Sequence, residues 1–156
     1  MMRTVGAVIG QPRAFAGRPG EGEQLIFGGT TIIVRASAAM TGGAFSMFEE
    51  SAPLLDTSRH VHANEDEMYY VVEGEHVYQC GDEEFRAGPG DLVFLPRGVP
   101  HAHRRVVPQA GRLIFMTFPG GFEGFFRILA EASRAGDLGE ATYARASREY
   151  GITWVD

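Results

Sequence analysis

The chain of 156 residues contains no lysine, because all 14 of its basic residues are arginines. Reactions that require a lysine, either as a Schiff base or as the phosphate-binding residue of a Walker motif, are therefore excluded. The formal net charge is -6. Surfaces for nucleic acids or anionic membranes need a concentrated basic patch, so we expect neither as a partner.

Cysteine is almost absent as well, since Cys80 is the only one. A single cysteine cannot form an internal disulfide or a cysteine-rich zinc site, and it fits a reducing cytoplasm. No apolar run approaches the roughly 20 residues that a membrane-spanning helix needs. We therefore expect a cytoplasmic protein with no membrane partner.

The chain is rich in glycine and proline, with 21 and 8 residues respectively. They separate short apolar or β-branched segments, as in turn-rich all-β proteins. Residues from about 30 to 118 predict a meander of short antiparallel strands that closes as a barrel or sandwich. A further strand over residues 4–9 would leave an open sheet edge, so we expect a homodimer that covers it. The length predicts one domain over residues 1–156.

The spacing of apolar residues changes from two to 3.6 after residue 121, which predicts a helix. Its large apolar side chains recur on one face, at Phe122, Phe125, Phe126 and Leu129. This stripe either packs in the core or also lines a ligand pocket. A second, weaker helix is predicted over about residues 140–150, ended by Gly151. The C-terminal helical segment therefore covers about residues 121–150.

Four residues have the side chains and the placement of metal ligands. His60 and His62 are two apart on a predicted strand, so both imidazoles project from one face. Glu67 follows across a polar turn, and His101 begins a later strand that can approach the first pair. Three imidazoles and one carboxylate suit a first-row divalent ion such as Fe, Mn, Co, Ni or Zn. With only four protein ligands, such an ion keeps positions for water or substrate.

The spacing of these residues resembles the two sequence motifs of the cupin superfamily. The matching segments are His60-x-His62-x4-Glu67-x6-Gly74 and Gly90-x5-Pro96-x-Gly98-x2-His101. The resemblance implies an all-β fold, the double-stranded β-helix or jelly-roll-like cupin barrel, followed here by one or two C-terminal helices. It also implies one divalent transition metal ion held by the four residues.

Two positions depart from the family pattern. Leu54 stands where a glycine is expected, and Arg105 stands where an asparagine is often found. Neither is a metal ligand, but both departures limit the transfer of substrate choice from relatives. His103 shares the parity of His101 and should face the barrel interior. It is either a hydrogen-bonded wall residue or a group that positions substrate or shuttles a proton.

Other polar residues near the motifs are assigned to structural roles. Glu65 and Asp66 should remain in solvent within the turn before Glu67, and His76 should lie on the surface. Tyr69 shares the parity of Glu67, and we expect it to pack as an aromatic side chain, although its hydroxyl could also reach the cavity.

Cupins include enzymes and non-enzymes, so the fold does not name a reaction. The phenylalanine-rich helix after residue 121 is similar to that of small bacterial quercetin 2,3-dioxygenase-like cupins. This resemblance implies a metal-dependent dioxygenase acting on a flavonol-like or other enolisable small molecule. Glu67 and His103 are then the candidate catalytic residues, with Glu67 also accepting the substrate proton. The alternatives are a redox-free polyketide cyclase or isomerase and a non-catalytic cupin that binds a small ligand.

Overall fold

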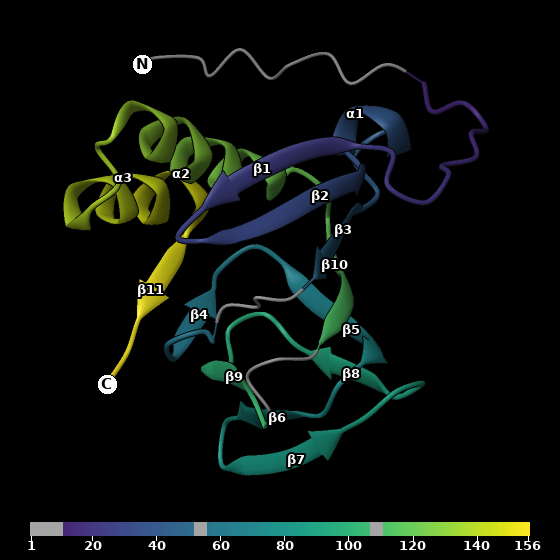
Figure 1. Ribbon diagram of the computed structural model, residues 1–156. Helices are drawn as coiled ribbons and strands as arrows, with labels where there is room; N and C mark the ends of the chain where they lie inside the picture. Colours follow the sequence, from purple (N-terminus) through teal and green to yellow (C-terminus); the bar gives the residue numbers. More distant parts are fainter. Residues whose placement is uncertain (1–10, 52–55, 107–110) are drawn as a thin grey trace.

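The computed structural model describes residues 11–51, 56–106 and 111–156, and its strands form two antiparallel sheets (Figure 1). The first sheet has the spatial order β1 (Glu23–Phe27), β2 (Thr30–Ala36), β3 (Ser46–Ser51), β10 (Arg112–Phe118), β5 (Asp66–Glu73) and β8 (Leu92–Leu95). The second has the order β11 (Ile152–Trp154), β4 (His60–His62), β9 (His101–Arg105), β6 (His76–Cys80) and β7 (Glu83–Ala87). The buried side chains of both sheets belong to one continuous core.

This strand order confirms the jelly-roll-like all-β fold and corrects the predicted meander. In a meander each strand pairs with the next along the chain, but in the described residues only β1–β2, β2–β3 and β6–β7 do so. Strand β10 instead lies between β3 and β5, and β9 lies between β4 and β6. The predicted strand over residues 4–9 lies outside the described residues, so the homodimer inferred from it stays a prediction.

The alternation of side chains along the strands decides what faces the interior. In β10 the even residues are half-buried, whereas the odd residues are enclosed between the sheets. Strand β5 pairs with β10 so that the same parity points inward. The inward residues of these two strands are Leu113, Phe115, Thr117, Glu67, Tyr69 and Val71. The alternation of side chains along β5 and β10 therefore places both the apolar core residues and the carboxylate of Glu67 in the interior.

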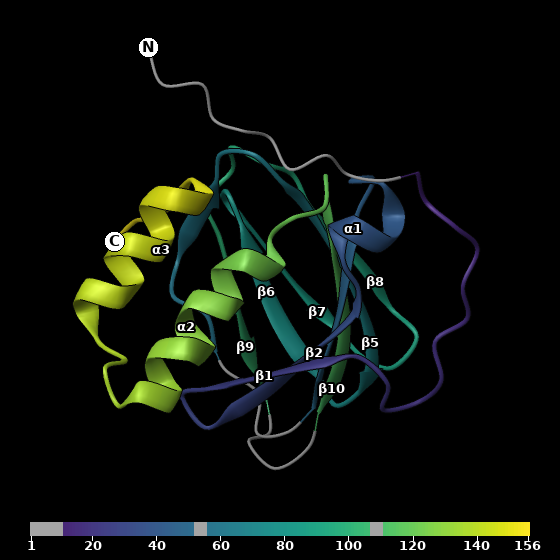
Figure 2. The ribbon, with the colours of Figure 1, turned by 90° about the horizontal axis from the view of Figure 1, so that it is seen from above.

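Three helices complete the described structure: α1 (Ala38–Thr41), α2 (Glu123–Ala135) and α3 (Glu140–Tyr150). Helices α2 and α3 lie side by side at one side of the sandwich, and α2 is the helix next to β1 (Figure 2). Both were expected from the sequence, and Phe125 and Leu129 are buried as predicted. Phe126 is only partly buried, with its ring edge-on to Phe48 at 5.3 Å. No helix in the described part of the chain has the length and apolar character to span a membrane.

A buried carboxylate attaches the start of α2 to the sandwich. Glu123 is 3% exposed and lies in the first turn of the helix. It accepts hydrogen bonds from the backbone N–H of Ala38, from the hydroxyl of Ser46 and from the backbone N–H of Gly121. These bonds satisfy buried donors of three separate segments and fix the position of Phe122 beside them.

We expect Glu123→Ala to lower the free energy of unfolding by about 2–4 kcal/mol, because it leaves several buried donors without an acceptor. Urea unfolding followed by circular dichroism measures the change. Glu131→Ala is the matched control, since Glu131 is exposed on the same helix. Equal stabilities of the two variants would contradict the anchoring role.

Candidate metal centre

The four predicted ligands lie together in the interior, although they come from three strands and both sheets. His60 and His62 are on β4, and His101 on β9 is the direct cross-strand partner of His60. Glu67 reaches them from β5 in the opposite sheet. All four side chains are buried, and their potential ligand atoms lie within 4.8 Å of one another.

Each of the three imidazoles is held by its Nδ1 atom, which leaves Nε2 to face the cluster. The Nδ1–H groups of His60 and His101 donate to the backbone carbonyls of Ser58, at 2.7 Å, and Val99, at 3.0 Å. A carbonyl oxygen can only accept, so the proton of the neutral ring is on Nδ1. The Nε2 lone pair is then available to an ion, the arrangement that metal-binding histidines use.

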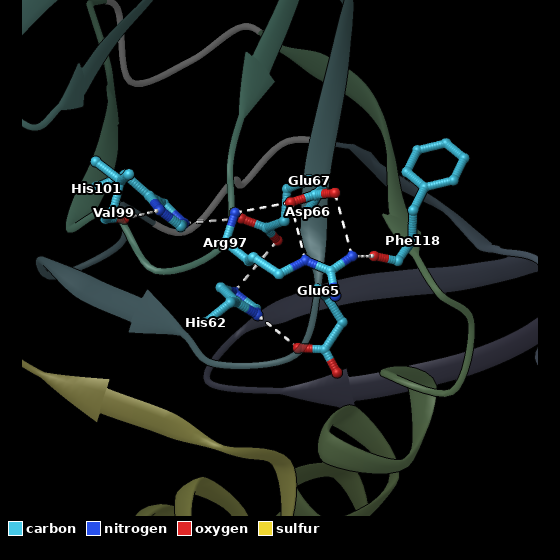
Figure 3. Close-up of polar contacts among 8 residues, drawn as sticks. All are labelled: His62, Glu65, Asp66, Glu67, Arg97, Val99, His101 and Phe118. Carbon is cyan, nitrogen blue, oxygen red and sulfur yellow. Dashed lines mark hydrogen bonds and ion pairs between the residues drawn. The ribbon is translucent and has the colours of Figure 1, made fainter.

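His62 is held in the same way by a side chain, because its Nδ1 donates to Glu65 Oε2 at 3.1 Å. On the other side of its ring, Nε2 lies 3.5 Å from Glu67 Oε1. His101 Nε2 lies 2.9 Å from Glu67 Oε2. Figure 3 shows the Glu67 carboxylate between these two imidazoles, and Glu65 on the opposite side of the His62 ring from Glu67.

The charge of Glu67 is stabilised by its histidine neighbours. Burial alone would raise the pKa of this carboxyl group, but His62 and His101 lower it to about 2. Burial lowers the pKa of His60 to about 4. Burial lowers the pKa of His62 as well, but the carboxylates of Glu67 and Glu65 outweigh this effect and raise it. Glu67 is thus anionic and His60 neutral, as a divalent metal requires, and His62 is the imidazole that would release a proton when the metal binds. The donor set therefore fits a first-row divalent ion in its chemistry, its burial and its orientation.

The loop before His101 is fixed directly to the first half of the cluster. The backbone N–H of Gly98 donates to the carbonyl of His62 at 2.8 Å. Gly98 has φ 76°, a left-handed conformation that favours glycine at this turn. Next to it, Arg97 pairs with Asp66 and also donates to the carbonyl of Phe118 (Figure 3). These contacts explain how the two distant motifs meet.

The cluster opens on a cavity of about 440 Å³. Its wall includes His60, His62 and Glu67, and most of the remaining wall is apolar or aromatic. Five phenylalanines line it: Phe27, Phe115, Phe122, Phe125 and Phe126. The aromatic stripe of α2 thus packs in the core and lines the cavity at once. This volume and lining are typical of a site for a small, largely apolar molecule.

His103 faces this cavity, on the side predicted from its parity. Thr57 fixes it twice, because the Thr57 hydroxyl accepts the backbone N–H of His103 at 2.9 Å and lies 3.3 Å from its Nδ1. Its Nε2 atom has no hydrogen-bond partner among residues 11–51, 56–106 and 111–156. Burial lowers the pKa of His103 to about 4, so the ring is neutral. A buried polar atom of this kind is matched to a polar group of a ligand or to water.

Two of the structural assignments made from the sequence are wrong. Glu65 is 7% exposed rather than solvated, because the turn folds its carboxylate back onto His62. His76 is fully buried, and its Nε2 donates to the carbonyl of Glu73 at 3.3 Å. It precedes Tyr78 on the inner face of β6, so it belongs to the core rather than to the surface.

Sequence reasoning missed several residues of the cavity wall, including Thr57, Trp154 and Glu50. Trp154 on β11 pairs opposite His60, and the two rings lie 5.2 Å apart. Glu50 on β3 lines the cavity with a buried carboxylate. The parity of β3 could have indicated Glu50, because it follows the inward Phe48 by two residues. No local pattern indicated Trp154, because β11 has only three residues.

Comparisons with known proteins agree with this geometry. A family profile of the cupin domain matches residues 48–117. The quercetin 2,3-dioxygenase of Bacillus subtilis is 28% identical over 113 residues, which are 72% of this chain and 33% of that protein. The chain thus spans a third of the length of that relative.

Two solved structures share the fold at low sequence identity. KdgF from Halomonas sp. has a TM-score of 0.58 at 18% identity, over 69% of this chain and 97% of that one. The nucleoside dehydratase Pac13 of Streptomyces has a TM-score of 0.55 at 17% identity, over 72% of this chain and 88% of that one.

We expect alanine at His60, His62, Glu67 or His101 to remove most of the bound metal, because three ligands leave an incomplete coordination sphere. Glu65→Gln should weaken metal affinity by roughly 10–100-fold, because Glu65 only orients His62. Elemental analysis measures occupancy. Quenching of Trp154, the only tryptophan of the chain, measures Co²⁺ affinity.

Glu83→Gln, at an exposed position of β7, is the control and should bind Co²⁺ like the wild type. Full metal occupancy in a folded His101→Ala protein would contradict the assignment of the cluster.

Proposed function

Because the chain is a member of the cupin superfamily, we propose that it is a metal-dependent dioxygenase of a flavonol-like or other enolisable small molecule. The ion is held by His60, His62, Glu67 and His101. The observation that carries this proposal is the opening of a buried three-histidine, one-carboxylate cluster onto an aromatic-lined cavity of about 440 Å³.

When bound, the ion supplies a Lewis acid that polarises an oxygen of the substrate. The rest of the chemistry falls to side chains that face the cavity. Glu67 presents its carboxylate there and is the acceptor of the enol proton. The five phenylalanines exclude water and hold a planar apolar body beside the cluster.

His103 is the second functional residue in this proposal. Its Nδ1 atom lies against the Thr57 hydroxyl, which already accepts the backbone N–H of His103 and so has its own proton to donate. If that proton goes to Nδ1, the neutral ring carries its proton on Nε2, directed into the cavity. His103 then donates a hydrogen bond to a substrate oxygen and orients it toward Glu67.

The similarity to quercetin 2,3-dioxygenase favours oxygen chemistry over the redox-free alternatives. That similarity covers a third of the relative. An oxygen electrode tests the proposal with metal-loaded protein and two probes, quercetin and acetylacetone. Oxygen consumption together with loss of the probe supports it. Conversion of a probe without oxygen consumption would favour the cyclase or isomerase alternative. No conversion of either probe with any of the five candidate metals would contradict it.

We expect His103→Phe to retain the metal and to lower kcat with the accepted probe by roughly 100-fold, because the hydrogen bond to the reacting oxygen is lost. Metal content and turnover are measured on the same preparation. His76→Phe is the control, since His76 is also a buried histidine but does not line the cavity. Unchanged turnover in a metal-loaded His103→Phe protein would eliminate this role.

A further inference from the structure

We infer that Trp154 is a specificity-determining residue, whose indole stacks on a flat aromatic ring of the ligand where the cavity opens beside the metal cluster. This inference rests on the proposed function and deepens it, because it assigns the part of the ligand that lies outside the chelating enol. The ligand class is a molecule with a planar ring next to the oxygens that bind the ion, rather than one with an aliphatic body.

The cavity opens to solvent between two segments of the chain. Among the described residues of its wall, the three exposed ones are Asp56, Ser58 and Trp154, and the others are buried or half-buried. Asp56 and Ser58 precede β4 in the chain, whereas Trp154 is on β11, the strand beside β4 (Figure 1). A ligand that enters by this opening therefore passes the indole of Trp154.

Strand pairing places Trp154 directly beside the metal cluster. Strand β11 pairs with β4 so that Trp154 lies opposite His60 and Ile152 lies opposite His62. Ile152 and Trp154 both line the cavity, whereas Thr153 between them is exposed and is not part of the wall. This is the alternation of a strand that turns one face to the interior. The two histidines of β4 and the two apolar residues of β11 thus form one continuous piece of wall.

The position of β11 is fixed to the segment that carries the metal ligands. The backbone N–H of Ala63 donates to the carbonyl of Gly151 at 2.9 Å, and the backbone N–H of Val155 donates to the carbonyl of Arg59 at 3.0 Å. Gly151 has φ 68°, a left-handed conformation that favours glycine between α3 and β11. Because these bonds flank Trp154 on both sides, the indole and the metal cluster keep a fixed relation to each other.

The indole is also oriented before any ligand binds. Its Nε1–H donates to the Ser147 hydroxyl at 2.9 Å, and Ser147 is buried on α3. The ring centroid lies 5.2 Å from that of His60, with 48° between the ring planes. Trp154 is nevertheless 44% exposed, so much of its apolar surface is open to contact. A ring that is already held in place binds a ligand with little further loss of conformational entropy.

The surroundings of the two histidines on β4 favour an aromatic ligand. Trp154 lies beside His60, and Phe122 lies beside His62 with ring centroids 4.8 Å apart. Phe122 in turn stacks on Phe125 at 5.0 Å, and both line the cavity. A ligand bound at the cluster thus meets aromatic surface beside both histidines. Paired aromatic rings stabilise a complex beyond the effect of the buried area alone, which selects flat rings over aliphatic groups of similar size.

The test compares two chelating probes with metal-loaded protein under anaerobic conditions, by isothermal titration calorimetry. 3-Hydroxyflavone and maltol share the hydroxypyranone group that binds metals, but only 3-hydroxyflavone carries benzene rings beyond it. We expect Trp154→Leu to bind 3-hydroxyflavone about three- to tenfold more weakly, because one aromatic contact is lost. Its affinity for maltol should change by less than about twofold, because the contact with the ion is unaltered. Trp154→Phe retains a flat ring and should keep most of the affinity for 3-hydroxyflavone.

Further variants separate stacking from a structural role of the indole. Thr153→Ala, on the same strand, and Phe94→Leu, at an aromatic residue that is 55% exposed on β8, should bind both probes like the wild type. Ser147→Ala removes the hydrogen bond to the indole and should weaken 3-hydroxyflavone binding less than Trp154→Leu does. Elemental analysis should show unchanged metal content in Trp154→Leu, because Trp154 is not a ligand of the ion.

Three outcomes would overturn the inference. They are an unchanged affinity of Trp154→Leu for 3-hydroxyflavone, an equal loss of affinity for both probes, and a loss of metal in Trp154→Leu. Oxygen does not enter the measurement, so failure of the proposed reaction is recognised separately. A protein that shows the expected selectivity but consumes no oxygen with any probe would contradict the dioxygenase proposal and support the role of Trp154.

Discussion

The carboxylate of Glu67 lies in the interior of the sandwich, and the cost of burying a charge explains the arrangement around it. His62 and His101 face its two oxygens, while Glu65 and the carbonyl of Val99 hold the far nitrogens of those rings. The polar groups are thus arranged in two layers that fit a cation at the centre. Both layers come from the same two segments, residues 62–67 and residues 99–101, which are far apart in the sequence. The pairing of strands that brings these segments together is therefore a condition for the site.

The alternation of side chains in β3 gives adjacent carboxylates different environments. Glu49 turns outward to two arginines, and Glu50 turns inward to the aromatic cavity. The same rule places the methionines of three strands on the solvent side of the sheet. One strand thus provides part of the cavity wall on its inner face and an ion-pair network on its outer face.

The aromatic stripe of α2 shows that core packing and ligand binding need not be alternatives. Phe125 is buried in the core and also lines the cavity. Phe126, on the same helix, contacts Phe48 of β3. Glu123 holds the start of this helix against the sandwich. The cavity wall thus depends on a buried carboxylate that has no direct contact with the metal cluster.

The sequence alone was sufficient to predict the all-β fold, the boundaries of α3 and the four clustered residues, because these features depend on local period, turn residues and motif spacing. The inward direction of His103 followed from parity in the same way. The strand order, the burial of His76 and the bond from Glu65 to His62 were decided by the tertiary structure. The place of Trp154 beside His60 was decided there too. The physical reason is that each of these features depends on which strands, distant in the sequence, pair with one another, or on how a turn folds back onto a strand. Such pairings arise from burial shared between segments that carry no local signal of one another.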